Sequence, residues 1–139
     1  MKGREVYILS YARTPIGSFQ GTLKSLSAPI LGALAIEGAI KKVNFPKKYI
    51  EEVIMGNVLS AGLGQAPARQ SAIYANLAKS VDCLTINKMC GSGLKSIMLA
   101  AQSISSGEVD VAIAGGMESM SNAPHSVSYT HLRAHETDY

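Results

Sequence analysis

Apolar residues recur at helical spacing in three stretches of the chain, separated by short and almost wholly apolar runs. The first helical stripe extends from Ile30 to Val43. Ser27 can cap this helix, Pro29 suits its first turn, and Asn44 begins the Asn-Phe-Pro sequence that stops it. The three stripes predict helices over residues 28–43, 67–79 and 91–106.

The intervening apolar runs predict four strands, over residues 6–11, 53–59, 83–86 and 109–114. Gly56 interrupts the second run, which indicates a bulge or a close neighbour. Strands and helices alternate with connections of crossover length, which is typical of an α/β fold with a parallel sheet and helices on both faces. Ligands gather at the carboxyl ends of such strands. We therefore expect Asn87 to Cys90 and Gly115 to Glu118 to be neighbours in space.

Cys90 lies where the third predicted strand gives way to a helix, and Gly-Ser-Gly follows it. The free N–H groups and the dipole at a helix N-terminus favour the thiolate, which is the attacking form of cysteine. Gly91 and Gly93 leave room for a substrate to approach the backbone, where N–H groups can face a developing oxyanion. The arrangement is the cysteine counterpart of a nucleophile elbow. The local pattern alone leaves two readings open, a catalytic nucleophile and a small buried hydrophobic residue.

Composition excludes several functional classes. Of the 139 residues, 47% are apolar and 17% are charged, which provides a core and argues against disorder. The net charge of +3 comes without a clustered basic stripe, so we predict no nucleic-acid partner. No apolar run reaches the roughly 18 residues of a membrane span, and the first residues do not resemble a secretory signal. We expect a cytoplasmic protein that does not bind membranes.

The two cysteines, Cys83 and Cys90, match no metal or redox spacing and are too few for a disulfide framework. In a reducing compartment both should be thiols, and we interpret Cys83 as structural. All three histidines lie in the last fifteen residues, so we predict no bound metal.

Four motifs, in this order along the chain, resemble those of the thiolases. The nucleophile motif is Asn87-Lys-Met-Cys90-Gly-Ser-Gly-Leu-Lys-Ser96. The other three are Ala12-Arg-Thr-Pro-Ile-Gly-Ser-Phe19, Gly62-Leu-Gly-Gln-Ala-Pro-Ala-Arg-Gln70 and Ala114-Gly-Gly-Met-Glu-Ser-Met-Ser-Asn-Ala-Pro124. The resemblance is nearly continuous from Val6 to His125 and favours the catalytic reading of Cys90. It implies the first half of a duplicated αβαβα layered fold, in which the mostly apolar helix after Cys90 is buried between two sheets.

The resemblance implies an acyltransferase, an acetyl-CoA C-acetyltransferase of fatty acid metabolism. Cys90 would accept an acyl group from a coenzyme A thioester as an acyl-cysteine, and a second acetyl-CoA would condense with it to acetoacetyl-CoA, or the reverse thiolysis would occur. The backbone N–H of Cys90 would contribute to an oxyanion hole. Coenzyme A thioesters are the implied substrates, with no tightly bound cofactor, and the full-length enzyme would be a homodimer or homotetramer. The sequence does not identify the residues that bind coenzyme A.

Thiolases carry further catalytic groups, a histidine, a second cysteine and an asparagine-bearing motif, in a C-terminal half. We find no such groups before Pro124, and we interpret residues 1–126 as an incomplete N-terminal thiolase domain that is inactive by itself. Residues 127–139 have neither strand alternation nor a helical stripe. We find no family resemblance in them and interpret them as a disordered or non-native end.

Two other functions stay open. One is a condensing enzyme of the ketoacyl synthase kind, which takes acyl groups from a carrier protein and whose nucleophile surroundings usually differ from Cys-Gly-Ser-Gly. The other is a non-catalytic fragment that binds a partner subunit.

Glu118 could be imagined as the missing base, but we favour a structural role in which it accepts hydrogen bonds from loop amides. Gln65 and Arg69 resemble family positions near the subunit contact, and we interpret them as structural or interfacial. We favour packing over substrate contact for three methionines near the motifs, namely Met89, Met117 and Met120. Their flexible thioethers leave a second reading open, in which they shape an acyl pocket near Cys90.

Overall fold

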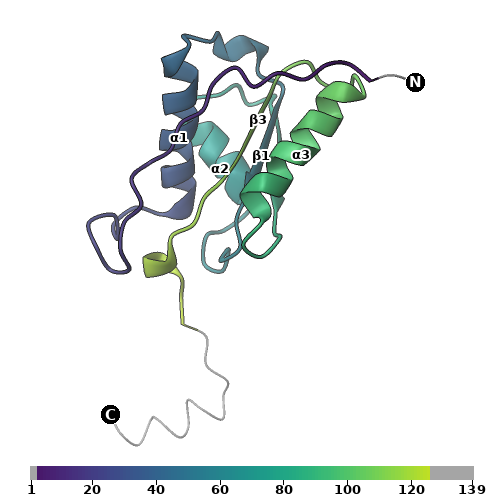
Figure 1. Cartoon of the computed structure of the whole chain (residues 1–139). Coiled ribbons are helices and arrows are strands. Elements are labelled where there is room, and N and C mark those ends of the chain that lie inside the picture. The colour runs from purple at the N-terminus through teal and green to yellow at the C-terminus, as the bar shows by residue number, and fades with distance from the viewer. Residues whose placement is uncertain (1–2, 126–139) are drawn as a thin grey trace, which may run out of the picture.

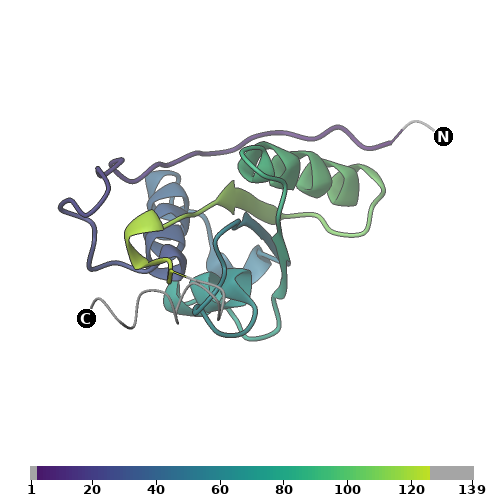
Figure 2. The same ribbon diagram turned by 90° about the horizontal axis from the view of Figure 1, so that it is seen from below.

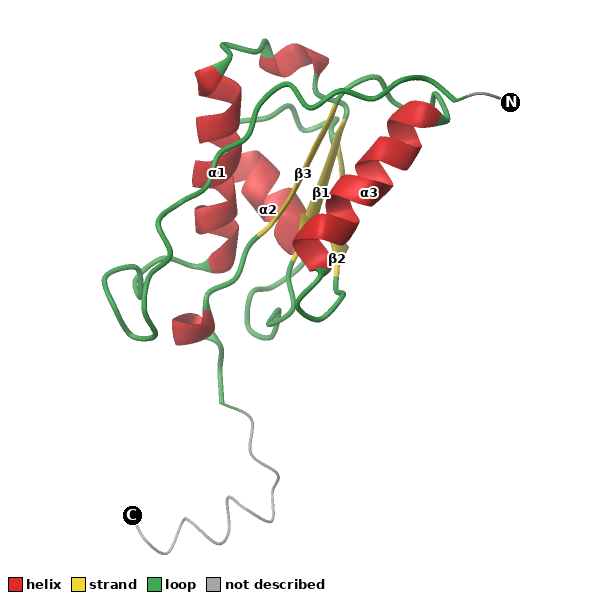
Figure 3. Ribbon diagram, in the orientation of Figure 1, coloured by secondary structure: helices red, strands yellow, loops and turns green. Residues whose placement is uncertain are grey.

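The structure is a computed structural model and describes residues 3–125. One sheet contains three parallel strands in the order β2-β1-β3, with β1 at Glu52–Gly56, β2 at Asp82–Ile86 and β3 at Ala112–Gly116 (Figures 1 and 3). The helices are α1 (Ala28–Lys42), α2 (Pro67–Tyr74) and α3 (Ser92–Ser105), with short 3-10 helices at Lys47–Tyr49 and Met120–Asn122. α1 and α2 pack against each other, and α3 lies on the opposite side of the sheet from α2 (Figure 2). The predicted α/β class, with a parallel sheet and helices on both faces, is confirmed.

The central strand β1 is buried on both faces. Met55 points toward α1, because its Cε lies 3.2 Å from where a Cβ on Gly32 would be. Ile54 is 1% exposed and belongs to the face that α3 covers, because successive side chains of a strand alternate between faces. A parallel strand covered on both faces needs apolar residues at consecutive positions, which explains the unbroken apolar run in the sequence.

α1 and α2 approach closely because small residues line their contact. A Cβ on Gly32 would come within 2.7 Å of both Ser71 Oγ and Met117 Sδ. Ser71 is fully buried, and its hydroxyl donates to the Pro29 carbonyl at 2.9 Å. Together with β1, these helices enclose the main hydrophobic core. α1 begins and ends close to the prediction, although the Ser27 side chain forms no capping hydrogen bond.

The predicted first strand, residues 6–11, is wrong. The segment pairs with no strand among residues 3–125, and its apolar side chains are exposed, from 38% at Val6 to 79% at Ile8. It runs across the outside of the molecule to α1 (Figure 2), where the Lys42 ammonium lies 3.8 Å from the centre of the Tyr11 ring. Its β-branched and aromatic residues favour extended backbone, but a strand also requires a sheet edge beside it.

Two other elements are shorter than predicted. α2 ends at Tyr74 and does not reach Lys79, because Asn76 adopts the left-handed conformation with φ of 56°. β1 ends at Gly56. The Asn57 N–H still donates to the Ile86 carbonyl of β2, but the next two amides, those of Val58 and Leu59, bind the Glu118 carboxylate and not a neighbouring strand.

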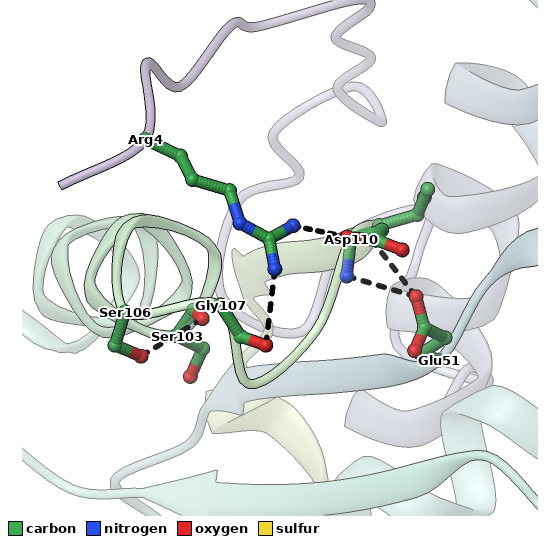
Figure 4. Close-up of polar contacts among 7 residues, drawn as sticks. Arg4, Glu51, Ser103, Ser106, Gly107 and Asp110 are labelled. Carbon is green, nitrogen blue, oxygen red and sulfur yellow. Dashed lines mark hydrogen bonds and ion pairs between the residues drawn. The ribbon is translucent and has the colours of Figure 1, made fainter.

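A polar cluster holds the start of β3, which begins later than predicted (Figure 4). Glu51 Oε1 accepts hydrogen bonds from the N–H groups of Asp110 at 2.8 Å and Val111 at 3.3 Å. Arg4 forms an ion pair with Asp110 and donates to the Gly107 carbonyl at 3.2 Å. The Arg4 and Asp110 side chains are both more than half exposed, so the ion pair contributes little stability. The cluster lies at the amino ends of the strands and attaches the N-terminal segment to the end of α3.

α3 buries only one of its faces. Ser96 and Ala100 face the sheet and are buried, whereas Leu94 is 67% exposed and Met98 is 48% exposed. Residues 3–125 form a single sheet, which covers one face of α3. The expected burial of this helix between two sheets concerns the complete duplicated fold and stays a prediction.

Candidate active site

The carboxyl ends of the three strands bring the sequence motifs together. Asn57 follows β1, the turn Lys88–Gly91 follows β2, and Met117 follows β3. The ladder continues past the strand ends, because the N–H of Asn57 donates to the Ile86 carbonyl and the N–H of Met117 to the Gly56 carbonyl, both at 2.9 Å. This edge of the sheet is therefore as well ordered by hydrogen bonds as the strands themselves.

The first turn of α3 rests on the end of β3. A Cβ on Gly116 would lie 3.3 Å from the Gly93 Cα. Ser96 Oγ lies 2.7 Å from the Gly115 carbonyl oxygen and 2.6 Å from that of Gly93, and it can donate to one of them at a time. The prediction that the Cys90 motif and the segment Gly115 to Glu118 are neighbours is confirmed.

The first turn of α3 also rests on the end of β1. A Cβ on Gly56 would lie 2.3 Å from the Ser92 Cβ and 2.8 Å from the Ser92 carbonyl carbon, which no real side chain can occupy. Gly56 therefore marks a close neighbour, one of the two explanations that its position in the strand left open.

Cys90 occupies the third position of the turn Lys88–Gly91, which the Gly91 N–H closes by donating to the Lys88 carbonyl at 2.7 Å. Its φ of 60° is left-handed, a conformation that costs a non-glycine residue about 1–3 kcal/mol. The Cys90 side chain is exposed, and α3 begins shortly after it at Ser92. The predicted position between a strand and a helix is confirmed. A strained, exposed residue in a strand-to-helix turn has the geometry of a nucleophile elbow.

The backbone N–H of Cys90 donates to no protein acceptor within residues 3–125. The adjacent N–H of Gly91 is already used by the Lys88 carbonyl. Of these two amides, the one on Cys90 is therefore available to a substrate oxygen.

Ser92 closes the nucleophile turn from the helix side. Its Oγ accepts a hydrogen bond from the Lys88 N–H and donates one to the Lys88 carbonyl, both at 2.9 Å. The residue is 7% exposed and packs against Gly56. We call this pair of hydrogen bonds the Lys88–Ser92 clasp.

Glu118 connects the end of β3 to the loop after β1. Its Oε1 accepts hydrogen bonds from Asn57 Nδ2 at 2.8 Å and from the Leu59 N–H at 3.0 Å, and its Oε2 accepts one from the Val58 N–H at 3.0 Å. Asn57 is 2% exposed and also donates to the Met117 carbonyl at 3.3 Å. The structural role expected for Glu118, as an acceptor for loop amides, is confirmed.

Cys83 is half-buried within β2, the strand that precedes the turn Lys88–Gly91. Burial raises the pKa of its thiol, and the neighbouring Arg69 guanidinium only partly offsets this effect. Arg69 donates to the carbonyls of Lys79 at 3.1 Å and Val81 at 3.5 Å, and thereby holds the connection between α2 and β2. These contacts agree with the structural interpretation of Cys83 and Arg69, and the interfacial alternative for Arg69 stays a prediction. Gln65 is exposed, and its carbonyl accepts a hydrogen bond from Gln70 at 2.8 Å.

Only one of the three methionines interpreted as packing residues is in the core. Met117 is 7% exposed, whereas Met89 is 73% and Met120 is 64% exposed. Met89 directly precedes Cys90 in the same exposed turn. The packing interpretation is therefore wrong for Met89 and Met120 within the described residues.

Two residues of this edge, Ser92 and Asn57, were not predicted from the sequence. The signal for Ser92 was a hydroxyl residue two positions after a candidate nucleophile, at the start of an apolar helix. The signal for Asn57 was a polar residue inside the apolar run 53–59. Both side chains are buried. Asn57 binds the carbonyl of Met117, which is distant in sequence, and Ser92 binds the backbone of Lys88 in the preceding turn. The local sequence pattern does not reveal either partner.

A hollow of about 280 Å³ lies beside Glu118, between the loop of residues 14–19 and the chain after β3. Apolar side chains that include Ile16, Phe19 and Met120 line it, and Cys90 is not part of its wall. No group of three or more His, Cys, Asp or Glu residues that could hold a metal ion occurs within residues 3–125. In the same range, no helix is both long and apolar enough to cross a membrane.

Comparison with known protein families identifies the family of this chain. The family described as Thiolase, N-terminal domain, matches residues 6–138. The chain belongs to the thiolase family. The match includes most of the segment 127–139, which lies outside the described residues, so our interpretation of that segment stays a prediction.

Relatives of this thiolase chain carry the names of enzymes. It is 58% identical over 124 residues to "Acetyl-CoA acetyltransferase B, mitochondrial" of Xenopus laevis, a match that covers 89% of this chain and 30% of the relative. It is 56% identical over 122 residues to "Acetyl-CoA acetyltransferase, mitochondrial" of Homo sapiens, covering 88% and 29%. The thiolase chain thus spans about 30% of the length of these curated relatives.

A solved structure has the same fold. The Acat5 thiolase from Ascaris suum, in complex with coenzyme A, matches with a TM-score of 0.87 and 52% sequence identity, over 91% of this chain and 33% of that one. The predicted thiolase-like fold is therefore confirmed.

The names of these relatives correct one expectation. We expected a cytoplasmic protein, and this is wrong, because relatives more than half identical to the thiolase chain are named mitochondrial. The expectation relied on the lack of a secretory signal pattern. That pattern has no bearing on mitochondrial import, since transit peptides are amphipathic and not apolar.

Proposed function

We propose that the chain is the N-terminal part of a thiolase-type acyltransferase, an acetyl-CoA C-acetyltransferase, in which Cys90 is the nucleophile. The observation that carries the proposal is the placement of Cys90, exposed and left-handed in the turn between β2 and α3. The names of the relatives and the coenzyme A bound to the Ascaris thiolase support coenzyme A thioesters as substrates. We infer a role in fatty acid metabolism from the family resemblance alone.

In the first half-reaction, the Cys90 thiolate attacks the carbonyl carbon of acetyl-CoA. A bond forms between the Cys90 sulfur and that carbon, the bond from the carbon to coenzyme A breaks, and coenzyme A leaves with the proton that Cys90 lost. The free N–H of Cys90 stabilises the oxyanion of the intermediate.

In the second half-reaction, another acetyl-CoA loses a proton from the methyl carbon beside its carbonyl. The resulting carbanion attacks the acetyl-cysteine, a carbon–carbon bond forms, and the bond to the Cys90 sulfur breaks, so that the sulfur regains a proton. The products are acetoacetyl-CoA and free coenzyme A, and the reverse sequence is thiolysis. The family resemblance implies that the groups which move these protons are in the part of the enzyme beyond residue 126.

The proposal is tested with the full-length protein that carries this chain. Incubation with acetyl-CoA should release free coenzyme A, form acetoacetyl-CoA, and add one acetyl group to the Cys90 peptide in a mass spectrum. The Cys90→Ser variant should lose the adduct and at least about a thousandfold of the turnover. The Cys83→Ser variant is the matched control and should keep both, since Cys83 is half-buried in β2. Normal turnover by the Cys90→Ser variant would contradict the proposal.

The alternative of a carrier-protein condensing enzyme is tested in the same assay. A thiolase should use acetyl-CoA faster than acetyl groups attached to an acyl carrier protein, and the opposite preference would favour the alternative. We also propose, from the family resemblance, that the full-length enzyme is a homodimer or homotetramer. Light scattering on the purified enzyme tests this, and a monomer would contradict it.

A further inference from the structure

Cys90 keeps an unfavourable backbone conformation, and something must hold it there. The turn Lys88–Gly91 has one closing hydrogen bond of its own, from the Gly91 N–H to the Lys88 carbonyl. A residue other than glycine in the left-handed region persists only when its surroundings over-determine it. The single turn bond leaves the Lys88 N–H without a backbone partner within residues 3–125, so the amino end of the turn is not fixed by the backbone.

Ser92 supplies the missing constraint. Its hydroxyl bonds both the N–H and the carbonyl of Lys88 at 2.9 Å, so the residue at the start of the turn is fixed to the first residue of α3. Ser92 itself is 7% exposed and packs directly against the bare backbone of Gly56 on β1. The constraint therefore passes from the central strand through Ser92 to Lys88, and Cys90 is held between the two ends of the clasp.

We propose that Ser92 is a positioning residue for the nucleophile, which keeps Cys90 in its reactive geometry through the Lys88–Ser92 clasp. This inference rests on the proposed function for the role of Cys90, whereas the clasp itself is a property of the described residues. Ser92 does not need to touch the substrate. Its effect is exerted on the orientation of the Cys90 sulfur and of the Cys90 N–H, which both change when the turn relaxes.

The test compares Ser92→Ala with Ser71→Ala in the full-length protein. Ser71 is a matched control, because it is also a buried helical serine whose hydroxyl bonds a backbone carbonyl, but it lies between α1 and α2. Both substitutions remove one buried hydroxyl and should lower the melting temperature to a similar extent. Only Ser92→Ala should slow acylation by acetyl-CoA, by at least about tenfold, with KM within about twofold of the original. Equal effects of the two substitutions on acylation would overturn the proposal.

Two measurements distinguish failure of this inference from failure of the proposed function, because neither requires acyl transfer. Alkylation of Cys90 by iodoacetamide at neutral pH should be at least about threefold slower in Ser92→Ala than in Ser71→Ala. Hydrogen exchange of the unsubstituted protein should show a protected Lys88 amide, although Lys88 lies in an exposed turn. An unprotected Lys88 amide refutes the clasp even if Ser92→Ala does not fold.

Discussion

The two cysteines of this chain differ in the features that control thiol reactivity. Cys90 is exposed in a strained turn at the start of α3, with a free backbone amide within the described residues. Cys83 is half-buried in a strand, and burial raises the pKa of its thiol. Because the thiolate is the reactive form, a raised pKa lowers the reactive fraction of Cys83 at any given pH below that pKa. Cys83 belongs to a strand and Cys90 to the turn after it, so their difference in exposure is a property of the fold.

Alkylation should distinguish the two thiols. We expect iodoacetamide at neutral pH to modify Cys90 at least about tenfold faster than Cys83, and the Cys83 rate to rise only at a pH above the ordinary thiol range. Peptide mass spectrometry after timed quenching measures both rates in one sample. The control is the same experiment in concentrated urea, where the rates should converge because the difference in burial is lost. Equal rates in the folded protein would contradict the assigned environments.

On the scale of elements, glycines at the ends of β1 and β3 allow the first turn of α3 to pack against the carboxyl edge of the sheet. Gly56 on β1 and Gly116 on β3 each lie against the backbone at the start of α3. Side chains at these two positions would lift the helix from the sheet and carry the nucleophile turn with it. The close approach therefore positions Cys90 as directly as the hydrogen bonds of the turn do.

Adding one methyl group at Gly56 tests this packing. In Gly56→Ala the new Cβ would lie 2.3 Å from the Ser92 Cβ, so we expect a loss of about 1–3 kcal/mol in the free energy of unfolding. Gly93→Ala is the control on the helix side of the same contact. Its Cβ would meet nothing closer than 3.8 Å, and alanine favours a helix over glycine by up to about 1 kcal/mol. Urea unfolding followed by circular dichroism measures both. A Gly56→Ala protein as stable as Gly93→Ala would show that α3 does not sit this close to β1.

The elements that could be predicted from the sequence are those whose start, end or type is determined by residues within or next to the element itself. The Pro29 start of α1, the apolar run of β2 and the Gly107 end of α3 each carry their own signal, and the position of Cys90 between strand and helix follows from them. Residues 6–11 have equally strong β-propensity but no adjacent sheet edge among the described residues, so the strand is absent. Side-chain partners such as Ser92 with Lys88 could not be predicted, because they depend on how the turn and the sheet meet.

On the scale of the whole molecule, residues 3–125 leave apolar surface uncovered on the side of α3. Leu94, Ile97 and Met98, which are neighbours on one face of this helix, are 67%, 43% and 48% exposed. Single exposed apolar side chains are ordinary, but contiguous ones mark a surface that another part of a protein covers. The thiolase chain spans about 30% of the length of its curated relatives, which is consistent with such a surface.

This surface predicts how the 139-residue chain behaves when it is produced alone. We expect it to bind the dye ANS strongly, to sediment as aggregates, and to release no coenzyme A from acetyl-CoA. Replacing Leu94 and Met98 by lysine should reduce dye binding by at least about twofold, because charged side chains interrupt the apolar surface on α3. Tyr74→Lys is the control, since Tyr74 is 54% exposed but lies on α2, on the other side of the sheet. Dye fluorescence and sedimentation velocity measure these effects. A monodisperse chain that binds no dye would contradict this prediction. It would mean that the outer face of α3 is covered in solution.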